Sequence, residues 1–231
     1  GWTGLRLPGI VNGFDGIGQD VHVDLPKTLA SMRMGSDRIC EIVLSLRNFS
    51  RLNEAAIKAV DIHTGLDNTL TILNHRLKAN NQRPAIQVIQ SYADNLPAVE
   101  CYAGLLNQVY MNILANAIEA IDDAWQPQPG PSRQTAGKIT VKTSLVDQYW
   151  VEISIADTGI GIPDAVQQQI FNPFFTTKPV GKGTGMGLAI SYQIVTDYHG
   201  GQLTCISRPY QGTEFILLIP IKQPTAVLAA A

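Results

Sequence analysis

Two clusters of glycine, separated by a phenylalanine-rich segment, lie between Asp157 and Leu188. Asp157 follows an apolar run, so we expect a carboxylate at a strand end, where the chain turns over Gly159 and Gly161. The second cluster precedes a helical pattern and consists of Gly181, Gly183, Gly185 and Gly187. A glycine loop that enters a helix offers unpaired N–H groups and a positive dipole end, which favour phosphate. The segment therefore predicts a nucleotide site, with a base at one end, phosphates at the other and a mobile cover between.

A second set of candidate residues lies on the strong helical pattern of residues 104–124. Opposite its apolar face runs a polar file, made up of Asn107, Asn112, Asn116, Glu119 and Asp123. Asparagine is a poor helix-interior residue, and Asn112 and Asn116 stand one turn apart, so their amides point the same way. A buried structural pair would explain them, but the glycine loops favour a polar ligand. Amide oxygens are hard ligands that suit Mg²⁺ together with phosphate oxygens and water.

The composition of the 231-residue chain is that of an ordinary folded protein, with 45% hydrophobic and 16% charged residues. A net charge of −2 gives no reason to expect nucleic acid or a membrane surface as a partner. The three cysteines are far apart and form no CxxC motif, which argues against a disulfide framework or zinc site and suits the cytoplasm. No membrane span or signal peptide is visible. The chain starts with Gly1 rather than Met, so we expect a fragment with further parts upstream.

The N-terminal quarter is predicted to hold one long helix. Residues 1–23 are glycine-rich and predict a lead-in or an added expression segment. From Asp24, a plausible N-cap, apolar residues follow a 4-3-4-3 spacing to about Arg51. Packing on its own domain would explain this stripe. We favour a helical hairpin or a homodimer, because such a helix at the edge of a chain usually buries its stripe against a partner helix.

The rest of the chain predicts an α+β fold. Strands are expected at residues 58–61, 84–92, 98–101, 138–145, 150–156, 202–207 and 213–219, and helices at 64–79, 104–124 and 188–199. Ile72 is assigned to the apolar face of the helix at 64–79, and Asp61 or Thr64 to its cap. A Pro-rich loop is expected at 126–136 and a tail after Pro220. His199, before a Gly-Gly pair, is interpreted as a helix C-terminal residue favoured by the dipole.

Four motifs, in order and spacing, resemble those of sensor histidine kinases. They are NQVYMNILANAIEAI (the N box), DTGIGIP (the first glycine box), FNPFF (the F box) and GTGMGLAIS (the second glycine box). The closing strand of their ATP-binding domain resembles GTEFILLIP, and the match spans roughly residues 60–220. One glycine box would be a weak signal, whereas four in register are highly specific. The resemblance implies a two-layer α/β sandwich of the Bergerat type, with a mixed sheet covered on one face by helices, as in gyrase, the Hsp90 chaperones and MutL.

The resemblance also implies roles for individual residues. Asp157 would accept a hydrogen bond from the adenine amino group of ATP, with Gly159 and Gly161 shaping the pocket and Thr213 supporting it. Asn116 matches the Mg²⁺-binding asparagine, and Asn112 would lie a turn earlier beside the phosphates. The second glycine box would line the phosphates through Gly183, Thr184, Gly185, Gly187 and Leu188.

Residues 163–187 would form a lid over ATP. Lys178 and Lys182 lie in that segment, where phosphate contact and simple solvation are equally expected.

The same comparison separates a kinase from an ATPase. The ATPase relatives carry a water-activating glutamate where this chain has Asn112, and an amide has no basic lone pair near neutral pH. A site of this kind holds ATP without hydrolysing it, and catalysis would rest on positioning and charge neutralisation. We therefore expect the γ-phosphoryl group to pass to a histidine, and from there to an aspartate of a response regulator.

One departure from the family pattern concerns the phosphoacceptor. His22, His63, His75 and His199 all lack the acidic neighbour and downstream proline of the acceptor motif. Residues 24–56 resemble the second helix of the dimerisation hairpin, so the histidine-bearing helix would be a separate partner. We expect a chain that binds Mg-ATP but does not phosphorylate itself. The alternatives are an ATP-hydrolysing clamp and a nucleotide-gated binding module.

The expected domain division follows from these assignments. Residues 1–23 form the lead-in, 24–56 the dimerisation-type helix, 57–221 the catalytic ATP-binding domain and 222–231 a tail. No part of the chain is expected to contact a membrane directly.

Overall fold

The computed structural model describes residues 57–125, 136–179 and 183–223. The chain divides into two compact units, and every described helix and strand belongs to the one made of Glu54–Thr177 and Thr184–Ala231. The other comprises Gly1–Asn53 with Lys178–Gly183. The predicted long helix and lead-in lie outside the described residues. So do most of the Pro-rich loop, most of the tail, and both Gly181 and Lys182.

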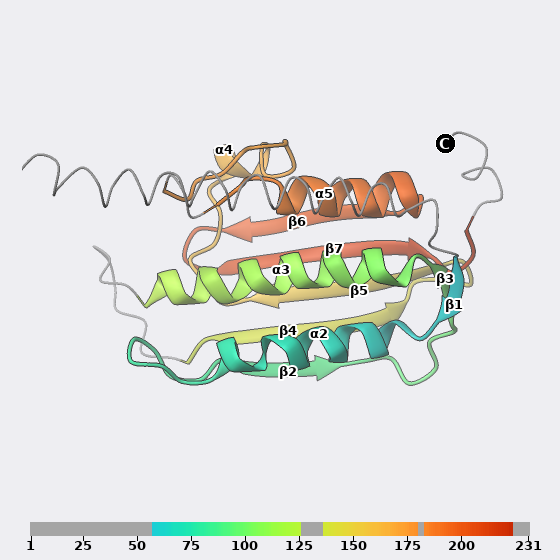
Figure 1. The fold of residues 1–231 in the computed structure, drawn as a ribbon, viewed down its shortest axis with the longest axis horizontal. Coiled ribbons are helices and arrows are strands. Elements are labelled where there is room, and N and C mark those ends of the chain that lie inside the picture. The colour runs from blue at the N-terminus through green and yellow to red at the C-terminus, as the bar shows by residue number, and fades with distance from the viewer. Residues whose placement is uncertain (1–56, 126–135, 180–182, 224–231) are drawn as a thin grey trace, which may run out of the picture. The chain divides into compact units, whose positions relative to one another are not determined.

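A five-stranded mixed sheet with the order β2-β4-β5-β7-β6 forms one layer of the larger unit (Figure 1). Its strands are β2 (Gln87–Ser91), β4 (Lys138–Leu145), β5 (Trp150–Asp157), β6 (Gln202–Arg208) and β7 (Gly212–Pro220). The β2–β4 pair is parallel and the other three pairs are antiparallel. The mixed sheet predicted from the motifs is therefore confirmed.

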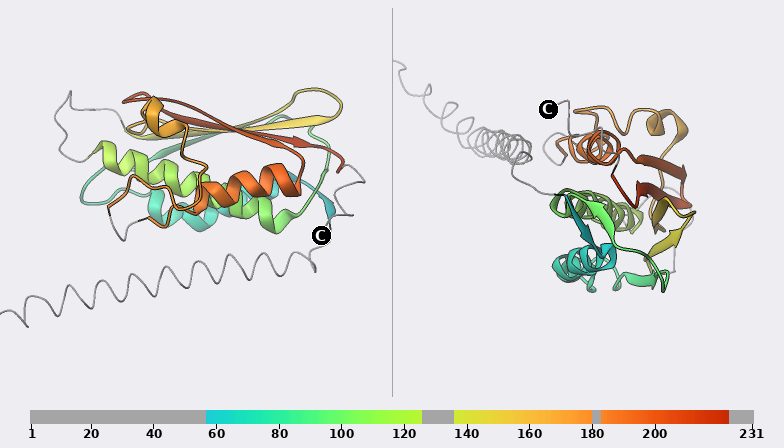
Figure 2. Two further views of the ribbon diagram at one scale, coloured as in Figure 1. Left: turned by 90° about the horizontal axis from the view of Figure 1, so that it is seen from above. Right: turned by 90° about the vertical axis from the view of Figure 1, so that its right-hand side faces the viewer.

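The second layer consists of helices on one face of this sheet (Figure 2). They are α2 (Ile62–Leu77), α3 (Ala103–Ala124) and α5 (Gly187–Gln193), which continues directly into a π-helical turn, η2 (Ile194–Tyr198). The core between the layers contains fully buried residues from both, such as Leu114 and Ile118 of α3 and Ile153 and Ile155 of β5. Alternation along β5 and the apolar stripe of α3 place these side chains in the core.

Two smaller elements complete the unit. The strands β1 (Lys58–Val60) and β3 (Val99–Cys101) form a separate antiparallel pair beside the N-terminal ends of α2 and α3 (Figure 1). A short helix, α4 (Asp164–Gln167), follows the first glycine box. No helix of the described ranges has both the length and the apolar character that a membrane crossing requires.

The helix α2 differs in two details from its sequence prediction. It begins at Ile62 rather than residue 64, because Asp61 is the N-cap and its side chain accepts a hydrogen bond from the backbone N–H of His63. Ile72, assigned from the sequence to the apolar face, is 61% exposed. Leu70 and Leu73 on either side of it are buried, so the buried stripe is narrower than the sequence indicates.

The environment of His199 also differs from the sequence interpretation. Its side chain is completely buried and Nδ1 donates to the carbonyl oxygen of Ile194 at 2.7 Å. Nε2 accepts a hydrogen bond from the backbone N–H of Tyr102, the residue before α3, at 3.1 Å. Burial lowers the pKa of His199 below its ordinary value. The residue is thus a neutral link between η2 and α3 rather than a cation at a helix end.

Candidate functional site

The carboxylate of Asp157 lies at the end of β5, where the sequence predicts it, and is 8% exposed. Its Oδ1 accepts a hydrogen bond from the backbone N–H of Gly159 at 2.7 Å, which holds the turn after the strand. A Cβ atom on Gly159 would lie 2.6 Å from the carbonyl carbon of Ala120 in α3, so only glycine fits. Ile160 donates to the carbonyl oxygen of Ala120 at 3.1 Å. These contacts fasten the first glycine box to the C-terminal half of α3.

Thr213 lies opposite Asp157 in the register of β5 and β7. It is buried, and its hydroxyl contacts that of Ser207 at 2.9 Å. Ser207 in turn accepts from the backbone N–H of Ile162 at 2.8 Å, in the first glycine box. Sequence reasoning selected Thr213 but missed Ser207. The signal for Ser207 was its position at the end of β6, directly across the hairpin from Thr213.

Two further observations define the surroundings of this end of the site. Gly161 has a φ of +69°, and a Cβ there would lie 2.0 Å from the carbonyl oxygen of Arg208. Both the left-handed backbone and the lack of space therefore require glycine. Burial, and after it the negative charge of Asp157, raise the pKa of Cys205 to about 12. The thiol of Cys205 therefore stays protonated and neutral.

Asn112 joins the N box to the second glycine box. Its side-chain amide donates to the carbonyl oxygen of Gly187 at 2.9 Å and to the hydroxyl of Ser191 at 3.1 Å. That hydroxyl also donates to the carbonyl oxygen of Gly187 at 2.8 Å. The first turn of α5 is therefore bound to the middle of α3. The sequence did not indicate Ser191 as a partner of Asn112.

Asn116 stands between the two attachments that α3 makes. It is half-buried, one turn after Asn112 and one turn before Ala120, on the same polar file of the helix. The first glycine box is bound at Ala120 and the second at Asn112. Asn116 is thus positioned on α3 between the two glycine boxes, with an amide group that suits a hard cation.

The phenylalanine-rich segment contacts the second glycine box. Gly185 has a φ of +68°, and a Cβ on it would lie 2.4 Å from the carbonyl carbon of Phe174. Gly187 has more room, because a Cβ there would lie 3.6 Å from its nearest neighbour, the side chain of Asn112. Thr184 accepts a hydrogen bond from the backbone N–H of Met186 at 3.4 Å, just before α5. Leu188, which follows Gly187, is half-buried against the core.

The remaining predicted site residues are Lys178, Lys182 and Gly183. Lys178 and Gly183 are described but belong to the other compact unit, and Lys182 lies outside the described residues. Asp157, Asn112, Asn116 and the glycines of the larger unit form the part of the predicted site that the structure brings together.

The fold and this arrangement define a class of protein: an α/β sandwich with a polar site between one long helix, the end of a central strand and two glycine-rich segments. The family described as "Histidine kinase-, DNA gyrase B-, and HSP90-like ATPase" matches residues 102–223, which is more than half of the chain. The chain belongs to this family, and the resemblance to sensor histidine kinases is confirmed.

Two similar proteins are named as kinases. The signal transduction histidine-protein kinase AtoS of Escherichia coli (strain K12) is 32% identical over 185 residues, covering 80% of this chain and 27% of AtoS. Sporulation kinase E of Bacillus subtilis (strain 168) is 34% identical over 155 residues, covering 67% of this chain and 18% of that kinase. The chain therefore spans about a quarter or less of the length of these two relatives.

Solved structures show the same fold. The catalytic domain of histidine kinase ThkA, in a nucleotide-free form, aligns with a TM-score of 0.57 at 29% identity. The alignment covers 71% of this chain and 95% of that domain. Full-length ShkA in complex with AMPPNP aligns with a TM-score of 0.64 at 25% identity, covering 89% of this chain and 41% of ShkA.

Proposed function

We propose that this chain is the ATP-binding catalytic part of a sensor histidine kinase, which transfers the γ-phosphoryl group of ATP to a histidine on a separate dimerisation helix. One observation carries the proposal above all others: α3 is bound to the first glycine box at Ala120 and to the second at Asn112, with Asn116 between them. In this proposal the carboxylate that would bind the base and the segment that would bind the phosphates are attached to the same helix. The relay would continue to an aspartate of a response regulator.

Asp157 is the group that would bind the adenine base. Its carboxylate accepts a hydrogen bond from the N–H of Gly159. Thr213, whose hydroxyl contacts that of Ser207, lies opposite it in the strand register. A carboxylate is an acceptor only, so it matches the donor character of an exocyclic amino group. Hydrogen bonds to a charged group are stronger than neutral ones, typically about 1.5–3 kcal/mol. The glycines of the first box keep the backbone close to α3 and to β6.

The phosphates would lie between α3 and the start of α5. The donor set fits a magnesium ion, because Asn116 offers a hard amide oxygen and the phosphates and water would complete the shell. Bound Mg²⁺ would neutralise negative charge on the phosphate oxygens. Thr184, Gly185, Gly187 and Leu188 would border the phosphates, and we extend this role to Gly183, Lys178 and Lys182 on the basis of the family resemblance alone. Residues 163–187 would then form the lid.

Asn112 favours a kinase over an ATPase. Its amide nitrogen is already used as a donor to Gly187 and Ser191, and an amide cannot take a proton from water near neutral pH. Without a base beside the γ-phosphate, water is a poor nucleophile, and the phosphoryl group is retained for histidine. The relatives named as histidine kinases and the ShkA complex with AMPPNP support this proposal.

The proposal includes partners that this chain does not supply. They are a histidine-bearing dimerisation helix, a response regulator and a second copy of the parent protein. Because ATP is the phosphoryl donor, we place the domain in the cytoplasm.

Calorimetric titration tests the first requirement. The 231-residue chain should bind ATP more tightly with Mg²⁺ than with EDTA, and should bind GTP more weakly, since guanine carries a carbonyl oxygen where adenine carries its amino group. Binding of ATP and GTP with equal affinity would contradict the role of Asp157, and absence of any binding heat would contradict the proposed function.

A further inference from the structure

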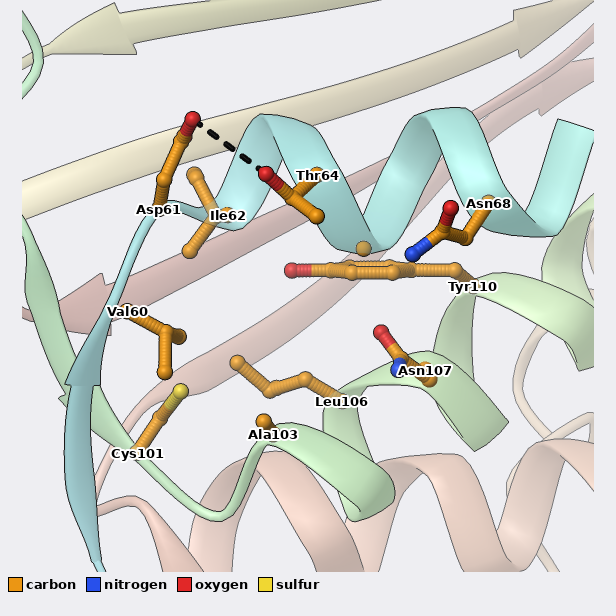
Figure 3. A pocket seen from close by; sticks show the side chains of 11 residues that line it. Val60, Asp61, Ile62, Thr64, Asn68, Cys101, Ala103, Leu106, Asn107 and Tyr110 are labelled. Atoms are coloured by element: carbon orange, nitrogen blue, oxygen red, sulfur yellow. Dashed lines mark hydrogen bonds between the residues drawn. The ribbon is translucent and has the colours of Figure 1, made fainter.

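A pocket distinct from the site above lies at the N-terminal ends of α2 and α3. It is open to solvent on one side and has a volume of about 230 Å³, larger than the roughly 150 Å³ engineered cavity that binds benzene. Figure 3 shows its walls, in which the apolar side chains of Val60, Ile62 and Leu106 and the amides of Asn68 and Asn107 surround one space. An apolar lining with a few convergent polar groups is typical of small-molecule sites.

The hydroxyl of Tyr110 is the unusual group in this pocket. The side chain is 1% exposed, and its oxygen has no hydrogen-bond partner among the residues that the structure describes. Figure 3 shows the hydroxyl pointing into the pocket, toward Val60 and Ile62. Burial raises the pKa of Tyr110, so the group remains a protonated donor. A buried donor without an acceptor is costly, so an acceptor supplied from outside would remove a penalty that the fold carries.

Gly65 provides space next to this hydroxyl. It lies inside α2, where glycine is less favourable than alanine by about 1 kcal/mol. A Cβ atom on it would lie 2.4 Å from Oδ1 of Asn107 and 3.3 Å from the ring of Tyr110. Any larger residue would therefore push into the pocket. Its φ is not in the left-handed region, so backbone strain does not explain the glycine and the need for space does.

The charges around the pocket limit the class of ligand. Among the described residues that line it, none is positively charged, and the one carboxylate, Asp61, accepts hydrogen bonds from His63 and Thr64 at the start of α2. An anion would meet no cation there. The amides of Asn68 and Asn107 form no hydrogen bond with another described residue, and amides bind neutral polar groups without a charge requirement.

We propose that this pocket binds a small neutral organic molecule whose carbonyl oxygen accepts a hydrogen bond from Tyr110 and whose ring lies against the apolar wall. The pocket is separate from the nucleotide site. Tyr110 and Ala120 are ten residues apart on α3, which corresponds to about 15 Å along the helix axis. The inference does not depend on the proposed kinase function, because Tyr110 lines this pocket together with residues of α2, whereas Asn112, two residues further along α3, is bound to α5.

The test uses two compounds of the same shape. The ¹⁵N-labelled 231-residue chain is titrated with acetophenone and, separately, with α-methylstyrene, in which a CH₂ group replaces the carbonyl oxygen. Saturable amide shifts are expected at Gly65, Asn68 and Asn107. Acetophenone should bind about threefold to tenfold more tightly, the ratio that one net hydrogen bond provides.

Tyr110→Phe isolates the hydroxyl. This change keeps the ring and removes a group that has no partner among the described residues, so the variant should be at least as stable as the parent chain. It should lose the preference for acetophenone while its affinity for α-methylstyrene is unchanged. Tyr198→Phe, at a tyrosine that does not line the pocket, serves as the matched control and should keep the preference. Gly65→Ala should weaken the binding of both compounds, because the added methyl group would occupy part of the pocket.

Three results would overturn the proposal. They are the absence of saturable shifts, as expected if only water enters the pocket, equal affinity of the parent chain for the two compounds, and a preference for acetophenone that persists in Tyr110→Phe.

Discussion

Asp157 and Thr213 face each other across β5 and β7, and both are buried, with 8% and 5% of their surfaces exposed. The pair connects two motifs that are 56 residues apart in the sequence, from position 157 to position 213. Through Ser207 the connection extends to the backbone of Ile162. The base end of the proposed site is therefore built on two neighbouring strands inside the sheet, where a fold opens least readily.

Replacement of Asp157 by alanine tests the base end. Loss of a charged hydrogen bond should weaken ATP binding by about 1.5–3 kcal/mol, or about tenfold to a hundredfold. The measurement is calorimetric titration with ATP, after circular dichroism has shown that the variant is folded. Asp94→Ala, at an exposed carboxylate after β2, is the control and should bind normally. Unchanged affinity in Asp157→Ala would contradict the assignment.

Asn116→Ala tests the metal position. If the amide oxygen is a ligand of Mg²⁺, the variant should lose affinity for ATP in the presence of Mg²⁺ and keep most of its weaker affinity in EDTA. Asn74→Ala, an exposed asparagine on α2, should behave like the parent chain under both conditions. Equal losses with and without Mg²⁺ would argue against a metal role and in favour of a structural one.

Asn112→Ala tests the attachment of α5 to α3. The change removes two hydrogen bonds, to Gly187 and Ser191, and should lower the free energy of unfolding by about 1–3 kcal/mol. Urea unfolding measures this value. Asn74→Ala should change it by less than about 0.5 kcal/mol, as surface substitutions usually do. A stability equal to that of the parent chain would show that Asn112 does not hold α5.

A matched pair of glycines tests the close approach of the first glycine box to α3. Gly159→Ala places a methyl group 2.6 Å from the backbone of Ala120 and should destabilise the fold by about 1–3 kcal/mol. Gly104→Ala, in the first turn of α3, has nothing within 4 Å of the new methyl group and should be neutral or slightly stabilising. Thermal unfolding compares the two. Equal midpoints would refute the steric argument.

The stability of the fold should depend on pH through His199. Burial lowers the pKa of His199 in the folded state below its ordinary value of 6.5. The unfolded chain therefore binds more protons in that window, so the contribution of His199 is present above about pH 6.5 and is lost as the pH falls. Urea unfolding at about pH 7.5 and about pH 5.5 should show a larger loss in the parent chain than in His199→Gln. The same pH dependence in both would rule out His199 as the cause.

The periodicity of the chain predicted its individual strands and helices, and the resemblance of its motifs to the histidine kinases predicted the mixed sheet. The strands around Asp157 and Thr213 were predicted to within about one residue, since buried alternation fixes their register. Site residues that depend on pairing between distant segments could not be found in this way. Ser207 and Ser191 act through partners chosen by the tertiary fold.

Other differences have identifiable physical causes. The helix α2 starts earlier than predicted because Asp61 rather than Thr64 is its N-cap. The sequence offered both residues as caps, and local hydrogen bonding decides between them. The π-helical turn at Ile194–Tyr198 and the burial of His199 arise together, since the ring binds the carbonyl oxygen of Ile194. Periodicity does not reveal a single π turn.

Transfer of the γ-phosphoryl group is the most direct test of the proposed function. The chain is incubated with [γ-³²P]ATP and Mg²⁺, alone and with a separately prepared dimerisation hairpin that carries a phosphoacceptor histidine. We predict an acid-labile label on the hairpin, no label on the chain itself, little free phosphate, and loss of transfer in Asp157→Ala. Rapid release of free phosphate without the hairpin, or acid-labile phosphohistidine on this chain alone, would contradict the proposal.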